Sequence, residues 1–422
     1  MSLYDLVVHF EQTWVYLALL VYFAWYPIGS SAMWIYTAII FFRRREGSRT
    51  AMGAGLYELT ETPPVSFVIP AFNEEANIVE TVEGVLAVDY PSLEVLVVDD
   101  CSTDGTLALL QPLADQGRIR LVRKRVNEGK AMALNDVLPL CNGDLIMVMD
   151  ADAVPHPDIL KAMVPHFRSP RVGGVTGNPR VVNRESFLSK LQAIEFASII
   201  SLMRRAQRVW GRIMTMSGVV GIFRREALQD VGYYSPEMAT EDIDMTWRLQ
   251  IRHWDVRYES QAIMWMRVPQ SLPGLWRQRR RWALGLSQVL HRHWRTVMRW
   301  EHRRFWPVLL EANLSVAWAY AYVFLSFVWI LSYALGYPPV GASPIPNFWG
   351  MLIATVCVVQ LITGVLLDRS YDRALPRYFI TAVFYPLVYW ILMAVITVVT
   401  HPQGLNVNRQ KSRYTLWKPV RE

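Results

Sequence analysis

Four long segments without a charged residue constrain this chain more than any other feature. They run from Thr13 to Phe42, from Ala312 to Tyr337, from Asn347 to Leu367 and from Tyr378 to Thr400. Each is long enough to cross a hydrocarbon core of about 30 Å, and helices of water-soluble proteins rarely lack charge for so long. The sequence therefore predicts an amino-terminal membrane segment (residues 1–46) and a carboxyl-terminal membrane region (residues 306–400) with about three spans.

Basic residues beside these segments predict how the chain is oriented. Arg43, Arg44 and Arg45 directly follow the first segment, and further arginines lie between residues 369 and 377. Since cytoplasmic loops carry an excess of Lys and Arg, both regions are expected in the cytoplasm. Four simple crossings would leave the basic tail, residues 401–422, outside. Either the rule fails for the tail, or Pro386 marks a re-entrant or split last segment.

Residues 47–270, between the membrane regions, have the pattern of a soluble α/β domain. Short apolar runs typical of buried parallel strands occupy Val65–Pro70, Leu93–Asp99 and Asp144–Met149. Helical patterns follow at Glu74–Val88 (with Asn73 as the expected cap), Thr106–Asp115 and Lys130–Pro139. This alternation predicts a doubly wound, Rossmann-like sheet whose ligands bind at the carboxyl ends of the strands.

Polar residues follow these strands, and one group is a candidate metal site. In the extended sequence Asp150-Ala151-Asp152 the two carboxylates share one face, and a bend after the strand can bring both to one cation. Hard oxygen ligands suit Mg²⁺ or Mn²⁺. The alternative is a solvated loop or a helix cap. The sequence contains no glycine-rich phosphate loop, which disfavours a dinucleotide oxidoreductase or a P-loop NTPase.

Two motifs later in the chain carry further chemistry. Thr240-Glu241-Asp242 offers a carboxylate that can accept a hydroxyl proton, although the two acids could instead simply open a helix. Gln278-Arg279-Arg280-Arg281-Trp282 offers a guanidinium for a diphosphate and an indole face for a sugar. A tryptophan beside arginines is also typical of a membrane anchor. Arg279 and Arg280 are expected only to face lipid.

Residues 271–305 are strongly basic and predict interfacial helices. Nine arginines and one glutamate stand between Arg277 and Arg304, interleaved with tryptophans. Beside a membrane span, this pattern favours a helix on anionic lipid over a nucleic-acid partner. The apolar spacing of residues 187–197 likewise indicates either an amphipathic helix on the membrane face or a plain core helix.

Five motifs together resemble the family-2 inverting glycosyltransferases with a GT-A fold. They are Ile69–Glu75, Val98–Asp104, Asp150–Asp152, Thr240–Asp242 and Gln278–Trp282, in the order and spacing of that family. Within it, Val175–Val181 and Gly274–Gln278 resemble the bacterial poly-β-1,6-N-acetylglucosamine synthases. The chain departs from many relatives at Ala283-Leu284-Gly285, where they carry Ala-Gln-Gly.

The resemblance implies a role for each matching residue. On the donor side these are Ala71, Asn73 and Glu75 in the nucleotide pocket, Asp100 on the uridine, Lys130, Gln278 and Arg281 at the diphosphate, Asp150 on the donor and metal, and Asp152 on the metal. On the acceptor side they are Ser217, Gly218 and Glu241 at its border, Asp242 as the catalytic base with Glu241 beside it, and Trp282 stacked on the terminal sugar.

The resemblance also implies the activity: processive, inverting transfer of N-acetylglucosamine from UDP-N-acetylglucosamine to a β-1,6-linked polymer, coupled to export. The expected setting is a bacterial plasma membrane with the catalytic domain in the cytoplasm. The expected partners are the nascent polysaccharide, membrane lipid and a small two-span subunit. The alternatives are a chitin- or hyaluronan-type synthase, a single-sugar transferase acting on a lipid, and a non-enzymatic subunit that keeps a dead transferase fold.

Overall fold

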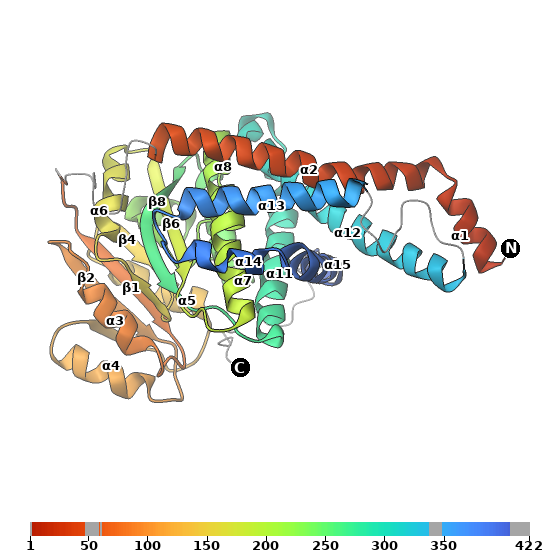
Figure 1. Cartoon of the computed structure of the whole chain (residues 1–422). Helices are drawn as coiled ribbons and strands as arrows, with labels where there is room; N and C mark the ends of the chain where they lie inside the picture. Colours follow the sequence, from red (N-terminus) through yellow and green to blue (C-terminus); the bar gives the residue numbers. More distant parts are fainter. Residues whose placement is uncertain (1, 47–58, 60, 337–347, 406–422) are drawn as a thin grey trace.

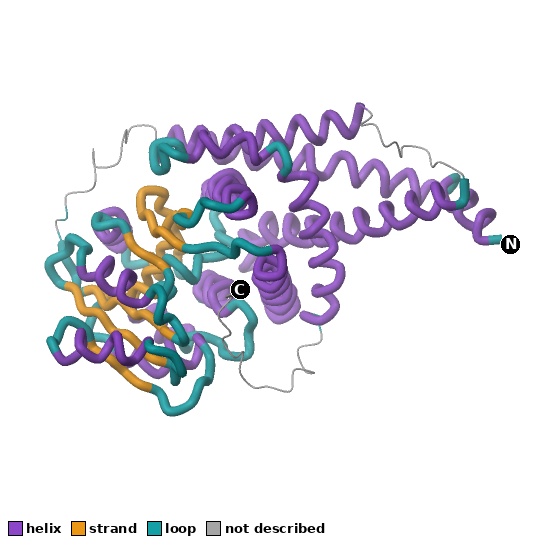
Figure 2. The backbone as a smooth tube through the Cα atoms, turned by 60° about the horizontal axis from the view of Figure 1, so that its bottom comes forward, coloured by secondary structure: helices purple, strands orange, loops and turns teal. Residues whose placement is uncertain are grey.

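The computed structural model describes residues 2–46, 59, 61–336 and 348–405. An α/β domain lies at one end, and long helices extend away from it (Figure 1). Figure 2 shows the strands gathered on one side of the molecule and the long helices on the other. The basic tail beyond residue 405 lies outside the described residues.

The strands of the described chain form one sheet with the order β3-β2-β1-β4-β7-β6-β8-β5. Their bounds are β1 Val65–Ala71, β2 Leu93–Asp99, β3 Arg120–Arg123, β4 Leu145–Val148, β5 Ala153–Pro155, β6 Val172–Val181, β7 Gly221–Arg224 and β8 Asp255–Met266. The first four are parallel and have the 3-2-1-4 order of a doubly wound sheet, as predicted. Beyond β4 the sheet is mixed: β7 runs antiparallel to both β4 and β6, β8 runs parallel to β6, and β5 runs antiparallel to β8.

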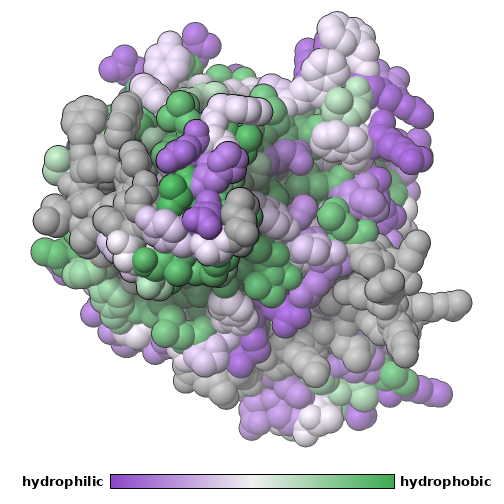
Figure 3. Space-filling model, turned by 90° about the vertical axis from the view of Figure 1, so that its right-hand side faces the viewer, coloured by the Kyte–Doolittle hydropathy of each residue, from purple (hydrophilic) through white to green (hydrophobic). Residues whose placement is uncertain are grey.

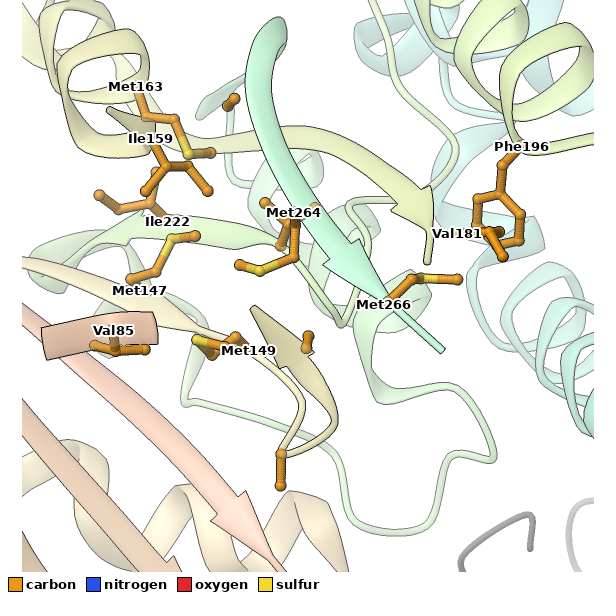
Figure 4. Close-up of a cluster of buried hydrophobic side chains, with 14 of the residues drawn as sticks. Val85, Met147, Met149, Ile159, Met163, Val181, Phe196, Ile222, Met264 and Met266 are labelled. Atoms are coloured by element: carbon orange, nitrogen blue, oxygen red, sulfur yellow. The ribbon is translucent and has the colours of Figure 1, made fainter. Parts of the chain in front are cut away.

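Burial explains why the first strands form. Every residue of β1 is buried, and the β-branched and apolar residues of β2 continue the same layer. Apolar side chains from β4, β7 and β8 meet those of α3 and α6 in one core, where Met147, Met149, Met264 and Met266 lie close together (Figure 4). Methionine is unbranched and polarisable, so it fills irregular space in such a core.

The helices of the domain cover both faces of this sheet. They are α3 Ile78–Leu86, α4 Thr106–Asp115, α5 Lys130–Val137, α6 Ile159–Met163, α7 Phe187–Glu195, α8 Leu202–Trp210, α9 Arg225–Val231 and α10 Glu241–Ile251. Three short irregular helices complete the set: η2 Leu138–Leu140, η3 Val164–Arg168 and the π-helix η4 Phe196–Ser201. Contrary to the prediction from the sequence, Asn73 does not cap α3. It adopts a left-handed conformation (φ 55°) in a turn, and α3 begins five residues later.

The remaining helices lie outside the α/β domain. They are α1 Leu3–Glu11, α2 Trp14–Phe41, η1 Phe42–Glu46, α11 Leu272–Val297, η5 Trp300–Phe305, α12 Trp306–Ala334, α13 Phe348–Asp368, η6 Leu375–Tyr378, α14 Phe379–Ala382, η7 Pro386–Trp390 and α15 Ile391–Gly404. Among the described residues, three helices are long and apolar enough to span a membrane: Trp14–Glu46, Trp300–Ala334 and Gly350–Asp368. Helices α2 and α12 project farthest from the domain with α1, and Figure 3, viewed from that end, shows apolar surface around a smaller hydrophilic group.

The last apolar segment is broken, as one of the two sequence interpretations expected. Between Tyr378 and Thr400 the chain forms α14, an irregular stretch, the π-helix η7 that begins at Pro386, and α15. Proline removes a helix donor and its ring clashes with the preceding turn, so a continuous helix is not expected there. At 14 residues, α15 is too short to count with the three spanning helices.

Helix α7 corrects the interfacial interpretation of residues 187–197. Almost all of its side chains from Leu188 to Glu195 are buried. It lies between β6 on one side and α13 and α14 on the other. The alternative of a plain core helix is therefore confirmed, and the apolar spacing reflects packing within the protein rather than contact with lipid.

A buried group of charges joins two of the spanning helices to the domain. Arg205 of α8 forms ion pairs with Glu46 at the end of η1 (2.9 Å) and with Asp368 at the end of α13 (2.7 Å). Asp368 also pairs with Arg180 of β6 at 2.6 Å. Removing one partner of such a pair leaves a buried charge uncompensated, which is strongly unfavourable. The group therefore holds these helix ends in place against the sheet.

Candidate active site

A cavity of about 970 Å³ lies where the domain meets the helices. Of the predicted site residues, those that line it are Lys130, Asp150, Asp152, Ser217, Gly218, Glu241, Asp242, Gln278, Arg281 and Trp282. They come from α5, the end of β4, the loop before β7, α10 and α11. The far side of the same cavity is lined by residues of α12 and α15, including Glu311 and Met393. One space thus connects the strand ends with α12, a candidate spanning helix, and with α15.

Asp242 lies in the first turn of α10 and is held from two sides. Its Oδ2 accepts a hydrogen bond from the Gly218 backbone N–H at 3.0 Å, and its Oδ1 accepts one from Ile243 N–H at 2.9 Å. A Cβ at position 218 would lie 3.3 Å from Asp242 Oδ2 and 3.2 Å from Lys130 Nζ, so glycine permits this close approach. Glu241 and Asp242 also begin the helix, so the helix-opening interpretation is confirmed, while the role of Asp242 as a base stays a prediction.

The surroundings of Asp242 make it more basic than an ordinary aspartate. Burial and the neighbouring Glu241 raise the pKa of the Asp242 carboxyl to about 6, while Lys130, Arg281 and the Gly218 N–H oppose the shift. At neutral pH such a group is mostly ionised and yet has appreciable affinity for a proton. Those are the properties of a general base.

Lys130 connects the donor side of the cavity with Asp242. Its ammonium forms an ion pair with Asp150, lies 3.5 Å from Glu241 Oε1, and lies 3.4 Å from the carbonyl oxygen of Gly218. Burial disfavours its charge, but Asp150, Glu241 and Asp242 outweigh burial and raise the pKa of Lys130. The lysine therefore stays charged and holds these acids together.

Asp150 and Asp152, the predicted metal ligands, both line the cavity, and their role toward a cation stays a prediction. Burial, together with the neighbouring Asp150 and Glu74, raises the pKa of Asp152 to about 7, because three acids crowd one corner of the cavity. Within the described residues no group of three or more His, Cys, Asp or Glu is arranged as a complete metal site. Mg²⁺ commonly takes only one or two carboxylates and completes its shell with substrate phosphates and water. The two aspartates fit such a partly open site.

The predicted nucleotide-pocket residues lie at the ends of β1 and β2, outside the lining of the main cavity. Asn73 Oδ1 accepts a hydrogen bond from Thr103 N–H at 2.8 Å, and Glu75 Oε2 accepts one from Gly105 N–H at 3.0 Å. These bonds join the loop after Ala71 to the loop after β2. They hold the two strand ends next to the cavity.

Asp100 is fully buried and holds the loop before Lys130. Its two carboxylate oxygens accept hydrogen bonds from the backbone N–H groups of Gly129 (2.8 Å) and Glu128 (3.2 Å). Burial raises its pKa, although these bonds oppose the shift. The neighbouring Asp99 is also buried, and its Oδ2 has no hydrogen-bond partner among the described residues. The contact predicted between Asp100 and a uridine stays a prediction.

The Gln278–Trp282 block lies on α11, whose start is well defined. Ser271 caps the helix by accepting from Gly274 N–H, and a proline stands in the first turn. Gln278, Arg281 and Trp282 share the face that lines the cavity. The buried Gln278 Oε1 has no hydrogen-bond partner within the part of the chain that the structure describes, so this oxygen is available to a ligand.

Arg279 contradicts the expectation that it only faces lipid. It is 1% exposed, and its Nη2 donates to Glu195 Oε2 at 2.6 Å and to the Tyr389 hydroxyl at 3.3 Å. Its guanidinium carbon lies 4.1 Å from the centre of the Trp282 ring. This distance permits a cation–π interaction that covers one face of the indole. Arg279 therefore positions Trp282, whereas Arg280 is exposed and contacts Gln403.

Helices α10 and α11 are locked together behind the site. A Cβ on Gly285 would lie 1.9 Å from Thr240 Oγ1, so only glycine allows this approach of α11 to the residue before Glu241. One turn farther along α10, Asp244 Oδ1 lies 2.8 Å from His293 Nε2 of α11. These contacts fix the face of α11 that carries Trp282 relative to Asp242.

The sequence patterns missed several polar residues that line the cavity: Glu74, Asn77, Arg204, Gln207 and Glu311. Glu74 stands within a recognised motif, so its position could have been inferred. Arg204 and Gln207 lie in α8, and the sequence offers no signal that distinguishes them from surface residues of a basic helix. Glu311 is an acid at the start of an apolar span, which is a general indication of a functional residue.

Comparison with known proteins decides the family. The family model described as "Glycosyltransferase like family 2" matches residues 63–285, which is more than half of the chain. The chain belongs to the family-2 glycosyltransferases. The match covers all five motifs that carried the resemblance, and this assignment makes the protein a sugar-transferring enzyme.

Members of this family with the same layout are found in staphylococci. The chain is 33% identical to the poly-beta-1,6-N-acetyl-D-glucosamine synthase of Staphylococcus epidermidis, over 93% of the chain and 95% of that protein. The same figures hold for the synthase of that name from Staphylococcus aureus strain COL. Among solved structures, a mannosyltransferase of Pyrobaculum calidifontis, in complex with GDP-Man and Mn²⁺, matches with a TM-score of 0.58 at 23% identity. That match covers 87% of this chain and 99% of the mannosyltransferase and confirms the predicted GT-A fold.

Proposed function

We propose that this family-2 enzyme polymerises N-acetylglucosamine from UDP-N-acetylglucosamine into a β-1,6-linked polysaccharide. The observation that carries the proposal is the single cavity in which Asp152, Asp242 and Trp282 share one space with the membrane helices α12 and α15. The name of the staphylococcal relatives, which match along nearly the whole chain, supports the sugar and the linkage.

The geometry supports a single displacement at the sugar C1. The acceptor hydroxyl oxygen forms a bond to C1 while the bond from C1 to the diphosphate oxygen breaks, and UDP departs with the bonding electron pair. Asp242 takes the hydroxyl proton as the new bond forms. One displacement inverts the configuration at C1 and needs no covalent enzyme intermediate. The raised pKa of Asp242 and its fixed orientation at Gly218 suit this task.

The leaving diphosphate requires positive charge and hydrogen-bond donors. Arg281 and Gln278 supply these from α11, and Lys130 supplies an ammonium from α5. Asp150 and Asp152 would hold a Mg²⁺ or Mn²⁺ ion, which when bound supplies further positive charge against the diphosphate. On the acceptor side, the Trp282 indole offers an apolar face to a sugar ring, and Arg279 holds the indole from the other face.

The spanning helices support a path for the polymer across a bacterial plasma membrane. A polysaccharide is too polar to cross lipid unaided, and the cavity continues to Ser315 of α12 and Thr397 of α15. Three crossings by α2, α12 and α13 put the ends of α2 and α13 on the same side as the domain, where Glu46 and Asp368 meet Arg205. An odd number of crossings also puts the end of α15 on the cytoplasmic side, in agreement with the arginines between residues 369 and 377.

Purification of the full chain and assay with each candidate UDP-sugar, followed by linkage analysis, tests the proposal. We expect UDP-N-acetylglucosamine as the one donor required and a β-1,6-linked product longer than a few sugars. A product limited to one sugar on extractable lipid, a second required donor, or another linkage would contradict it. Co-purification from the native membrane tests the predicted two-span partner subunit.

A further inference from the structure

Arg204 is a buried arginine that faces the catalytic cavity. It is 7% exposed, lies on α8 and lines the cavity that Asp242 and Trp282 also line. One of its nitrogens, Nη1, donates to the carbonyl oxygen of Gly177 at 3.0 Å. Across residues 2–46, 59, 61–336 and 348–405, no carboxylate forms an ion pair with it. A buried cation without an anion in ion-pair contact is unfavourable unless something else compensates the charge.

The other buried arginines near this region all have such an anion. Arg205, the next residue, pairs with Glu46 and Asp368, while Arg279 pairs with Glu195. Arg204 and Arg205 therefore have different roles, although they are neighbours on one helix. Arg205 fixes α8 to the membrane helices, and this fixes where the guanidinium of Arg204 stands.

Arg204 keeps its charge and feels the charge of Asp242. Burial lowers the pKa of Arg204 to about 10, and Tyr258 and Asp242 oppose the shift. At neutral pH it is therefore a cation with unused N–H donors in the same cavity as the proposed base. A guanidinium has five N–H donors, and the structure shows one hydrogen bond to a described residue.

We propose that Arg204 is an acceptor-binding residue that donates hydrogen bonds to oxygen atoms of the acceptor's terminal sugar. This inference rests on the proposed function. The terminal sugar must put its attacking hydroxyl at Asp242 and its ring at Trp282, and both residues line the cavity into which Arg204 projects. Hydroxyl and acetamide carbonyl oxygens are the acceptors that such a sugar offers to a guanidinium.

The surrounding charges favour a neutral sugar over an anionic acceptor such as a lipid phosphate. Asp242 and Glu311 line the same cavity, and they and the donor diphosphate would repel a second anion there. A neutral sugar with many oxygens gains hydrogen bonds from Arg204 without that repulsion. Hydrogen bonds to a charged group are stronger than those between neutral groups.

The test compares Arg204→Gln and Arg204→Lys with the control Arg208→Gln in the purified full chain. Arg208 lies one turn farther along α8, pairs with Asp255 and does not line the cavity. The assay varies the concentration of a β-1,6-linked N-acetylglucosamine trisaccharide at saturating UDP-N-acetylglucosamine. We expect Arg204→Gln to raise the half-saturating trisaccharide concentration about tenfold or more, which is the effect of losing a hydrogen bond to a charged group. UDP affinity should change less than about twofold, Arg204→Lys should recover part of the loss, and Arg208→Gln should match the unchanged enzyme.

Two results would overturn the inference. One is an unchanged dependence on the trisaccharide in Arg204→Gln. The other is a loss of UDP affinity as large as the loss of trisaccharide affinity, together with lower thermal stability. That result would make Arg204 a structural residue. If the unchanged enzyme extends no trisaccharide but transfers to polyprenyl phosphate, the proposed function itself fails. If the unchanged enzyme extends the trisaccharide and Arg204→Gln does so equally well, only the role of Arg204 fails.

Discussion

Replacing Arg279 by methionine removes a buried charge while nearly conserving the length of the side chain. In the structure Arg279 is 1% exposed and Glu195 6% exposed, and their ion pair measures 2.6 Å. The substitution leaves Glu195 as a buried carboxylate whose pKa burial already raises. It also removes the cation that lies 4.1 Å from the Trp282 ring.

The magnitude follows from the burial of both partners. Removing one member of a buried ion pair costs about 3–5 kcal/mol, whereas replacing both by apolar or neutral groups of similar size is nearly neutral. Loss of the cation–π contact adds about 0.5–2 kcal/mol. We therefore expect Arg279→Met to lower thermal stability severely. The double variant Arg279→Met with Glu195→Gln should recover most of that stability, but it does not restore the support behind Trp282.

The assay measures the temperature at which half of the detergent-solubilised protein remains monodisperse, together with polymer synthesis and UDP binding. The double variant should be stable and bind UDP nearly as well as the unchanged protein, yet synthesise polymer more slowly. Arg280→Met, at the exposed neighbouring position, is the matched control and should resemble the unchanged protein in stability. The reasoning is refuted if Arg279→Met is as stable as that control, or if the double variant recovers synthesis completely.

Three further predictions follow from the site. Since Asp242 must be ionised to accept a proton and its pKa is about 6, the rate of synthesis should fall as the pH is lowered through about 6 and be about tenfold lower near pH 5. An initial rate that does not change with pH would count against Asp242 as the base. Gly285→Ala should impair synthesis strongly, because its Cβ would lie 1.9 Å from Thr240 Oγ1, whereas Gly29→Ala, with no atom within 4 Å of its Cβ, should synthesise polymer at the normal rate. EDTA should stop synthesis and Mg²⁺ or Mn²⁺ should restore it, and Asp152→Asn should raise the metal concentration that gives the half-maximal rate. Synthesis that EDTA does not change would exclude the proposed metal.

Much of the catalytic domain could be predicted because its signals are local. The apolar runs of β1 and β2 and the acids that follow them are contiguous in the sequence. The acid pair at the start of α10 and the tryptophan of α11 likewise stand in short motifs. The family match then placed these motifs in one fold, and the structure brings Asp150, Asp242 and Trp282 to one cavity.

The features that could not be predicted depend on pairs of residues far apart in the chain. Arg279 was expected to face lipid because its partners, Glu195 and Tyr389, are 84 and 110 residues away. The burial of α7 likewise depends on α13 and α14, which lie far along the chain. The mixed half of the sheet, from β7 to β5, could not be predicted, because the alternation of side chains along a strand does not reveal the direction of its neighbour.

The sequence also could not distinguish Arg204 from its neighbour on the same helix. Its sequence neighbour Arg205 has the same chemistry, and only the fold separates an arginine that pairs with Glu46 from one that faces the cavity. The break in the last segment was one of two interpretations that the sequence left open, because Pro386 and the basic tail disagreed with four simple crossings.

The most direct test of the account is polymer synthesis by Asp242→Asn in the purified full chain, measured together with UDP binding. The substitution keeps the shape of the side chain and its hydrogen-bonding position at Gly218, but removes the group that accepts the proton. The account predicts that synthesis from UDP-N-acetylglucosamine is abolished while UDP affinity stays close to that of the unchanged enzyme. Undiminished polymer from Asp242→Asn would contradict the assignment of the base.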